Sequence, residues 1–568
     1  MNNAMLLTDG YKLDHRRQYP KGTQYVYSTW IPRSNKYLPE APGAVVFGLQ
    51  YLIKEYFIDY FNKNFFDRPK REVVKEFQDL LDSYLGPNSI GTQHISELHD
   101  LGYLPIRVKA LPEGTICPIG VPAFTIVNTN PNFFWITNFL ETIISNVIWL
   151  PMTSATSAYL YKKELVRHSK KTGFYDAANI SFLCHDFSMR GMAGLEASIL
   201  SGMAHMTSFN GSETIPAIEA IKKYYGCDGI IAGTVPATEH SVMCAGGYAD
   251  ELLTFKRLIN DVYPSGFVSI VSDTWDFWKV VTSYLPILKE DIMKRNGRVV
   301  IRPDSGDPVD IICGVTNNVV HIPEEGFEDK EEAKAFYEET IIERVAEITP
   351  FAEMGPESYS MIFEHQGIYT EITLENIQWN RMDKQYYFID MWEHAKFSYK
   401  VVDSTIYKGA YELLWETFGG TINDKGFKVL DSHIGLLYGD SITLDRQKEI
   451  YSKLEAKGFA ATNLVLGIGS YTYQYKSRDT LGFAMKATWC MINEEYKEIF
   501  KKPKTDDGTK NSLKGLCMVY KDAEGKLRVK DQCSEVEECQ GELETVFEDG
   551  TLCFEDTFDE IRKRLCKN

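Results

Sequence analysis

Short apolar runs that end in polar residues recur along the middle of this chain. The clearest, Val299–Ile301, fits a strand buried on both faces, and it stops abruptly at the sequence RPDSGDP over residues 302–308. Five further segments place polar or glycine residues at the end of an apolar run: 180–191, 233–241, 268–273, 436–440 and 463–470. Because α/β sheets and barrels carry their active sites at the carboxyl ends of strands, this pattern predicts a barrel-like α/β arrangement around one polar site.

The pattern differs on either side of this region. Residues 24–30 and 106–127 resemble short strands broken by Pro and Gly, so residues 1–130 are predicted to form a mostly β-rich first domain. Residues 131–485, where longer helices alternate with apolar strands, are the predicted α/β barrel core. A charged helix and an aromatic, strand-rich stretch inside it indicate an insertion at about 315–430 with its own small sheet. The last segment, 486–568, is predicted to complete the β-rich domain.

Composition narrows the class of protein. A net charge of −18 argues against a nucleic-acid partner, since phosphate backbones require a basic surface. The 11 cysteines show no CxxC pairs and no zinc spacing, which favours reduced thiols in the cytoplasm. Residues 1–19 lack the apolar core of a signal peptide, and the apolar window 133–152 is interrupted by Asn138, Glu141 and Asn146. We therefore expect a buried helix there and no membrane partner.

The strand ends carry several side chains suited to chemistry. Arg302 offers a planar fork of donors for a phosphate or a carboxamide oxygen, and Asp304 and Asp307 offer acceptors for sugar hydroxyls or a hydrated metal. His240, directly after Glu239, could act as a nucleophile toward phosphate or as an acid–base group. A turn with a surface ion pair, or a histidine held by a backbone carbonyl, would explain the same residues structurally. Their position after buried strands favours a functional role.

Other segments suggest ligand contacts. Gly469 and Ser470 could present backbone N–H groups to a phosphate, with two cations, Arg478 and Lys486, downstream. A tight turn and a solvated helix face are the structural alternatives. Phe187 beside Arg190 could stack on a flat heterocycle or be ordinary core, and Gly439-Asp440 could contact ribose hydroxyls or cap a helix; these alternatives stay open.

Taken together, eight segments resemble the type II phosphoribosyltransferases, and within them the nicotinamide phosphoribosyltransferase family. They are DGYKLDHRRQYP, HDFSMRG, TVPATEHS, SIVSD, IRPDSGDP, YGDS, GIGSYTYQYKSRDT and MKAT, which occur in the family's order and span nearly the whole chain. The resemblance implies transfer of phosphoribose from 5-phosphoribosyl 1-pyrophosphate to nicotinamide, giving nicotinamide mononucleotide and pyrophosphate. It also implies Mg²⁺, ATP as co-substrate, and an irregular, TIM-like α/β barrel with a second, β-rich domain. Finally, it implies a homodimer with active sites at the interface.

The same resemblance assigns expected roles to single residues. Phe187 and Tyr11 of the partner subunit would sandwich nicotinamide, while Arg302 and Ser269 would lie near its carboxamide. The ribose would meet Asp304, Asp440 and Gly439, and the histidine that ATP phosphorylates would be His240, next to Glu239. Phosphate and pyrophosphate contacts would come from Gly469, Ser470, Arg478, Lys486, Arg33 and Arg190. No metal ligand is assigned, because Mg²⁺ is expected mainly through pyrophosphate.

Two departures from the family pattern affect substrate choice. Glu213 stands where the family has an aspartate that accepts from the carboxamide, and Thr234 stands for a serine. A carboxylate there favours a neutral amide and repels nicotinate, although the longer arm changes the geometry. Three alternatives remain: a nicotinate enzyme, a barrel hydrolase using Asp304, Asp440 and a metal, and a non-catalytic dimeric nucleotide-binding protein. The insertion has no assigned role.

Overall fold

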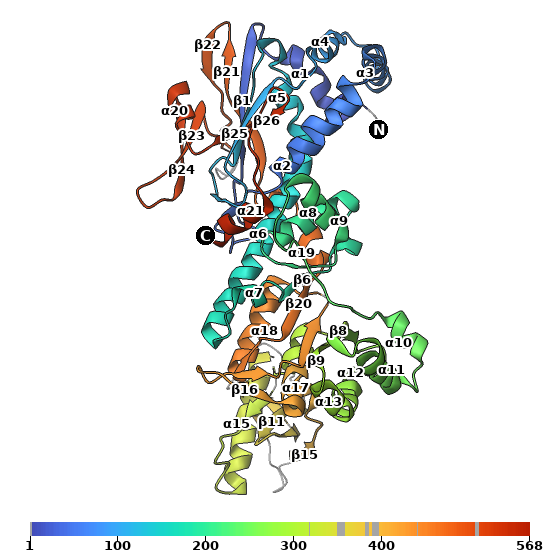
Figure 1. Ribbon diagram of the computed structural model, residues 1–568. Coiled ribbons are helices and arrows are strands. Elements are labelled where there is room, and N and C mark those ends of the chain that lie inside the picture. The colour runs from blue at the N-terminus through green and yellow to red at the C-terminus, as the bar shows by residue number, and fades with distance from the viewer. Residues whose placement is uncertain are drawn as a thin grey trace.

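The computed structural model describes residues 3–316, 319–348, 358–375, 377–380, 385–388, 397–439, 441–505 and 511–567. Figure 1 shows a β-rich lobe at one end, an α/β lobe beyond it, and the long helix α6 (Glu141–Thr172) running between the two. Most of α6 is buried, because its apolar residues lie on all sides of the helix.

The α/β lobe is built on a parallel sheet that carries the predicted strand ends. Every neighbouring pair in it is parallel, and the register sets Val299 beside Ile434 and Ser269 beside Val300. The order of its six described strands is β7 (Gly211–Ser212), β6 (Cys184–Asp186), β20 (Leu464–Ile468), β18 (Ile434–Tyr438), β9 (Asn296–Arg302) and β8 (Ser265–Val271). Their central residues are buried, as continuous apolar runs in a parallel sheet require.

The two edges of this sheet are linked by an irregular segment. Gly233 forms a single parallel bridge to Gly211 of β7, and Ala237 forms one to Ser269 of β8. The prediction of an α/β fold with a parallel sheet is confirmed. The regular ladder, however, is a half-barrel of six described strands, and a complete TIM barrel is not seen in the described part of the chain. Pro236 partly explains why the barrel is not closed by a regular strand, because a proline has no backbone N–H to donate to a neighbouring strand.

The β-rich lobe joins both ends of the chain in one sheet. β1 lies between β21 and β5, so residues near 25 pair with residues near 490. The sheet order is β22 (Glu495–Glu498), β21 (Ala484–Ile492), β1 (Thr23–Ile31), β5 (Phe124–Asn128), β3 (Ile106–Ala110), β25 (Glu544–Glu548) and β26 (Thr551–Leu552).

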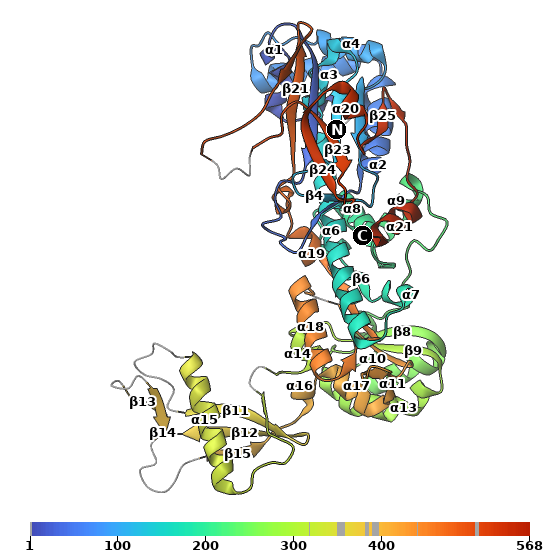
Figure 2. The same ribbon diagram turned by 90° about the vertical axis from the view of Figure 1, so that its left-hand side faces the viewer.

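A smaller unit projects from the α/β lobe, as Figure 2 shows. It has its own hydrophobic cluster, in which α15 (Lys330–Ile348) covers one face of a four-stranded sheet. The chain then returns to the main core at α17 (Ala410–Phe418), so the separately packed part of the predicted insertion lies within 319–401. Its strands are β10 (Val319–His321), β11 (Ser358–His365), β12 (Ile368–Glu375) and β15 (Phe397–Val401), with β13 (Ile377–Asn380) paired to β14 (Gln385–Phe388). Residues 389–392 of the predicted aromatic stretch lie outside the described residues.

The remaining elements cover these sheets. The helices are α1 (His15–Gln18), α2 (Leu49–Tyr51), α3 (Lys70–Leu85), α4 (Gln93–Leu101), α5 (Ile136–Phe139), α7 (Ala177–Ile180), α8 (Leu195–Met206), α9 (Ile215–Tyr224), α10 (His240–Gly246), α11 (Glu251–Arg257), α12 (Phe277–Lys279), α13 (Leu285–Met293), α14 (Pro308–Cys313), α16 (Thr405–Lys408), α18 (Leu444–Ala456), α19 (Ser470–Gln474), α20 (Glu535–Cys539) and α21 (Phe558–Cys566). The short strands are β2 (Gly43–Val45), β4 (Ile116–Pro118), β16 (Gly420–Ile422), β17 (Lys428–Leu430), β19 (Phe459–Ala460), β23 (Leu516–Lys521) and β24 (Leu527–Cys533).

Two further features bear on the class of protein. The 11 cysteines are all free thiols. Among the described residues, no single helix is long and apolar enough to cross a membrane; residues 131–139 and 141–172 meet the criteria only as a pair, bent by 42°.

A buried carboxylate ties the C-terminal segment to the β-rich lobe. Glu113 accepts hydrogen bonds from the backbone N–H groups of Gly48 (3.1 Å) and Gln50 (2.7 Å). Its own N–H donates to Asp556 (3.2 Å), which is bound in turn by Arg564 (2.7 Å). Burial, opposed by those two N–H donors, raises the pKa of Glu113 to about 7.

This raised pKa predicts a stability that depends on pH. Between about pH 4.3, where an unfolded glutamate titrates, and about pH 7, the folded state keeps a proton that the unfolded chain has lost. The free energy of unfolding therefore falls as pH rises through this window, and Glu113→Gln should remove that part of the fall. Denaturant midpoints at the two ends of the window test this, with the exposed Glu555→Gln as control. Equal pH dependence in Glu113→Gln and in the unaltered protein would contradict the expectation.

Candidate active site

An aromatic ring lies at the end of β6, where the sequence predicts a ligand contact. The backbone N–H of Phe187 donates to the carbonyl of Ile468 (2.9 Å), which fixes the residue beside β20. A Cβ atom added at Gly467 would lie 2.6 Å from the Phe187 ring, so glycine is required for this close packing. The Phe187 ring is half-buried, and its centre lies 5.1 Å from that of His185.

A carboxylate stands next to this pair of rings. Glu213 follows the two-residue strand β7, and its backbone N–H donates to the carbonyl of Asp186 (3.0 Å). Its Oε1 accepts a hydrogen bond from the Thr234 hydroxyl and lies 3.5 Å from Nε2 of His185. The contact with His185 is the largest cause that lowers the pKa of Glu213, so the group is an anion at neutral pH. Glu213 and Thr234, the two departures from the family pattern, are therefore in direct contact.

Two polar side chains at the ends of adjacent strands are left incompletely paired. Ser269 of β8 is only 1% exposed, and its hydroxyl has no hydrogen-bond partner among the described residues. Arg302 of β9 donates through Nη2 to the carbonyl of Thr238, while its buried Nε has no partner there either. Burial lowers the pKa of Arg302, and Asp304, Asp273 and Glu213 oppose that shift. Buried polar groups are normally satisfied, so the Ser269 hydroxyl and Arg302 Nε are available to bond a ligand.

His240 begins α10 and lies between two carboxylates. Its Nε2 is 3.9 Å from Oδ1 of Asp273 and 3.9 Å from Oδ2 of Asp304, and its Nδ1 is 3.1 Å from the Thr274 hydroxyl. The imidazole is about half exposed, at 47%, so a phosphate donor could reach it. The preceding Glu239 accepts from the Ser241 hydroxyl and does not touch this cluster through any contact seen in the described residues.

The two aspartates of the RPDSGDP segment, Asp304 and Asp307, have different surroundings. Asp273 accepts from the Asp304 N–H (2.8 Å), which holds Asp304 against Gly439, where an added Cβ would lie 3.1 Å from Oδ1. Asp307 instead caps helix α14 by accepting from the Val309 N–H (2.9 Å). Asp440, the other predicted ribose contact, lies outside the described residues.

The predicted phosphate loop lies at the end of β20, where Ser470 begins the short helix α19. A Cβ atom added at Gly191 would lie 2.0 Å from the Ser470 hydroxyl, so the turn that carries Arg190 packs closely on this loop. Arg190 is exposed, and nothing lies within 4 Å of a Cβ added at Gly469. The loop is thus open to solvent beside a cation.

The other predicted phosphate contacts form a separate group in the β-rich lobe. Arg478 and Tyr11 line one hollow of about 270 Å³, together with Glu141. Burial lowers the pKa of Lys486; the negative charge of Glu141 opposes this shift, whereas Arg33 and Arg478 add to it. Several cations therefore gather here, which suits an anionic ligand.

The structure thus brings the predicted residues together as two groups. Figure 1 and Figure 2 agree that α1, which follows directly after the segment of Tyr11, lies in the β-rich lobe and that β6 lies in the α/β lobe. Within one chain, Tyr11 and Phe187 therefore stand on different lobes. The sequence likewise places Tyr11 in the predicted first domain (residues 1–130) and Phe187 in the predicted barrel core (residues 131–485).

Three residues that contact the site were not among the predicted site residues. Asp186 is completely buried and accepts from the hydroxyls of Ser188 (2.6 Å) and Thr214 (2.7 Å). It thereby fixes the end of β6 beside Glu213. Asp273 and His185 are the other two, and the available signal was their place at the ends of apolar runs.

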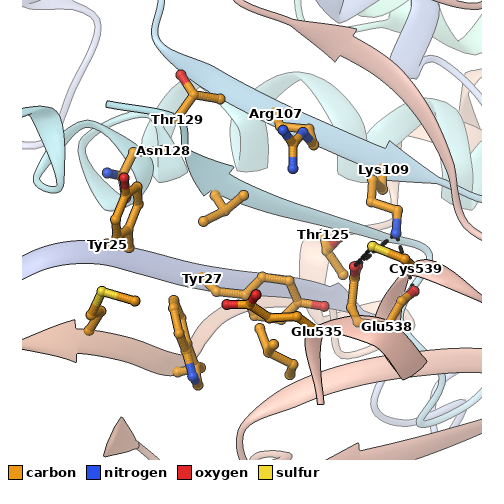
Figure 3. Close-up of a pocket in the computed structure, with 14 residues that line it drawn as sticks. Tyr25, Tyr27, Arg107, Lys109, Thr125, Asn128, Thr129, Glu535, Glu538 and Cys539 are labelled. Carbon is orange, nitrogen blue, oxygen red and sulfur yellow. Dashed lines mark hydrogen bonds and ion pairs between the residues drawn. The ribbon is translucent and has the colours of Figure 1, made fainter. Parts of the chain in front are cut away.

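A second hollow, of about 460 Å³, lies on one face of the β-rich sheet (Figure 3). Tyr25 and Tyr27 of β1 line it, and Lys109 of β3 pairs there with Glu538 of α20 at 2.9 Å. None of the residues predicted for catalysis or substrate binding is part of its lining. This hollow is therefore separate from both groups of predicted site residues.

The chain matches two family descriptions. Residues 182–343 and 393–551 match the nicotinate phosphoribosyltransferase (NAPRTase) family, and residues 3–108 match the nicotinamide phosphoribosyltransferase N-terminal domain. The chain is 42% identical to a nicotinamide phosphoribosyltransferase from Acinetobacter baylyi, over 100% of this chain and 97% of that one. It is 30% identical to one from Mycoplasma pneumoniae, over 90% and 94% of the two chains.

The fold is similar to a solved structure of more distant sequence. A nicotinate-nucleotide pyrophosphorylase from Pyrococcus furiosus superposes with a TM-score of 0.50 at 14% identity, over 99% of this chain and 94% of that one. The family matches cover more than half of the chain, and a close relative matches it from end to end. The chain therefore belongs to the nicotinamide phosphoribosyltransferase family.

Proposed function

We propose that the chain transfers phosphoribose from 5-phosphoribosyl 1-pyrophosphate to nicotinamide, giving nicotinamide mononucleotide and pyrophosphate for NAD salvage in the cytoplasm. The observation that carries the proposal is the incompletely paired set at the strand ends: the Ser269 hydroxyl and Arg302 Nε beside the Glu213 carboxylate. Hydroxyl and guanidinium suit the oxygen of a carboxamide, and a carboxylate suits its N–H group. A carboxamide can form hydrogen bonds with all three groups. The carboxylate of nicotinate would instead be repelled by the Glu213 anion.

The remaining residues support the transfer chemistry. Cleavage of the anomeric bond develops positive charge on ribose and negative charge on pyrophosphate. The Phe187 ring holds the pyridine in line with the anomeric carbon without competing for its nitrogen, and Asp304 lies where the ribose is expected. The cations of the β-rich lobe, Arg478 and Lys486 among them, stabilise the phosphates.

Magnesium fits this arrangement through the substrate. The described residues contain no cluster of three or more His, Cys, Asp or Glu side chains able to hold a metal ion. Mg²⁺ commonly binds through substrate phosphates with one or two carboxylates and several waters, and Asp304 and Asp273 could supply those carboxylates. When bound, Mg²⁺ would neutralise charge on the departing pyrophosphate.

A homodimer would unite the two groups of residues. Tyr11 and Phe187 lie on different lobes of one chain, so Tyr11 of the partner subunit is the residue that could close the sandwich around nicotinamide. Large apolar side chains near both groups are exposed, which is typical of a protein contact. They include Tyr11, Leu195, Ile215, Tyr471 and Tyr475.

His240 is proposed to be phosphorylated by ATP, because it is exposed between Asp273 and Asp304 and can act as a phosphate nucleophile. His240→Ala should abolish acid-labile phosphate on the protein and the ATP hydrolysis that depends on it. Slow transfer without ATP should remain, because the pyridine site is untouched. Phosphate labelling from ATP measures the first effect. A variant that still carries this phosphate would show that another residue accepts it.

The reaction itself is tested by mass balance. With 5-phosphoribosyl 1-pyrophosphate and Mg²⁺, nicotinamide should give mononucleotide and pyrophosphate in equal amounts. Release of phosphate or sugar without a pyridine product would favour a hydrolase, and tight mononucleotide binding without turnover would favour a binding protein.

A further inference from the structure

His185 is a buried histidine for which the proposed mechanism has no role. It is 7% exposed, and a Cβ atom added at Gly211 would lie 2.5 Å from its Nδ1, so the absence of a side chain at Gly211 makes room for the ring. Its other nitrogen, Nε2, lies 3.5 Å from Oε1 of Glu213, and its ring lies beside Phe187. The imidazole is therefore held between the pyridine platform and the carboxylate that faces the substrate amide.

The contact between His185 and Glu213 links the protonation of His185 to the net charge that faces the substrate. A neutral His185 leaves Glu213 as an anion, which accepts from the amide of nicotinamide and repels the carboxylate of nicotinate. A protonated His185 donates to Glu213 and makes the pair neutral, so the repulsion is largely removed. Nicotinate itself keeps its charge above about pH 5, since carboxylic acids titrate near pH 4.

We propose that His185 is a positioning residue whose protonation, acting through Glu213, sets the preference for nicotinamide over nicotinate. The inference rests on the proposed function. It adds a pH-dependent choice of pyridine substrate to that function.

The other charged groups around His185 do not provide a pH-dependent charge, so this role falls to His185 and Glu213. Burial lowers the pKa of His205, which faces His185 from α8, so that histidine stays neutral. Asp186, next in the chain, is saturated by hydroxyl and backbone donors. Arg302 acts on Glu213 from β9 and carries its charge over the whole range.

The test is the ratio of kcat/KM for nicotinamide to kcat/KM for nicotinate, measured from about pH 5.5 to pH 8. In the unaltered protein the ratio should fall about tenfold toward acid, along a curve for one proton. His185→Gln keeps a hydrogen-bond donor but cannot gain charge, so its ratio should be flat with pH. His433→Gln is the matched control, because His433 pairs with Asp431 (2.7 Å) at the opposite end of the sheet.

The possible outcomes separate the inference from the proposed function. A ratio that is flat in the unaltered protein while nicotinamide is converted would overturn the role of His185, and this result needs no variant. A pH-dependent ratio that persists unchanged in His185→Gln would also overturn it. No mononucleotide from either pyridine at any pH would instead refute the proposed function.

Discussion

Replacing Arg302 with lysine is expected to lower kcat/KM for nicotinamide about 100-fold. The guanidinium bonds the Thr238 carbonyl through Nη2 and keeps Nε for a ligand, whereas a lysine ammonium is a single point that cannot reproduce this fork. Because the Nε atom is buried, water cannot replace the lost donor. Steady-state kinetics with nicotinamide as the varied substrate give the measurement.

Arg298→Lys provides a matched control on the same strand. Arg298 bonds the Ser432 carbonyl (2.9 Å) near the amino end of β9, away from the site, so its replacement should leave kcat/KM within about twofold. Equal losses in both variants would mean that the Arg302 effect is structural and that the carboxamide contact lies elsewhere.

The second large effect is expected when two inactive variants are mixed. Tyr11→Ala and Phe187→Ala should each lose most activity, since each removes one face of the proposed sandwich. If a site takes one face from each subunit, a mixed dimer has one intact site and one doubly altered site. After unfolding and refolding together, activity should return to about a quarter of the unaltered value.

Refolding each variant alone is the control, and a mixture of Phe187→Ala with Arg302→Lys is a second one. Those two residues lie on the same lobe at the ends of β6 and β9, so that mixture should stay nearly inactive. Failure of the Tyr11 and Phe187 mixture to recover activity, with mixed dimers present, would place both rings in one chain.

The strand ends were predictable because each is a buried apolar run that stops at polar residues. The run before Arg302 and the one before Gly469 both became strands of the parallel sheet. The segment from Gly233 to Ala237 has the same pattern but did not form a regular strand. It makes only single bridges, one to each edge of the sheet. A closed barrel was therefore expected where the regular ladder forms a half-barrel.

Contacts between distant side chains could not be predicted in the same way. His185 and Glu213 approach because a strand of two residues, β7, lies beside β6, and so short a strand has no periodicity to recognise. Asp307 belongs to the same polar motif as Asp304 but caps a helix. The arrangement of the two lobes along α6 likewise depends on packing between distant segments.

Glu213 departs from the family pattern, and neighbouring side chains fix the position of its carboxylate. Its longer arm left the geometry open in the sequence, yet Thr234 and His185 both contact its Oε1. Those contacts hold the carboxylate at the strand ends.

The most direct test of the account offers nicotinamide and nicotinate together, at equal concentration, with 5-phosphoribosyl 1-pyrophosphate, Mg²⁺ and ATP at neutral pH. The two mononucleotide products are then quantified. The account predicts that nicotinamide mononucleotide is in large excess, because the Glu213 anion accepts from an amide and repels a carboxylate. A predominance of nicotinate mononucleotide would contradict it.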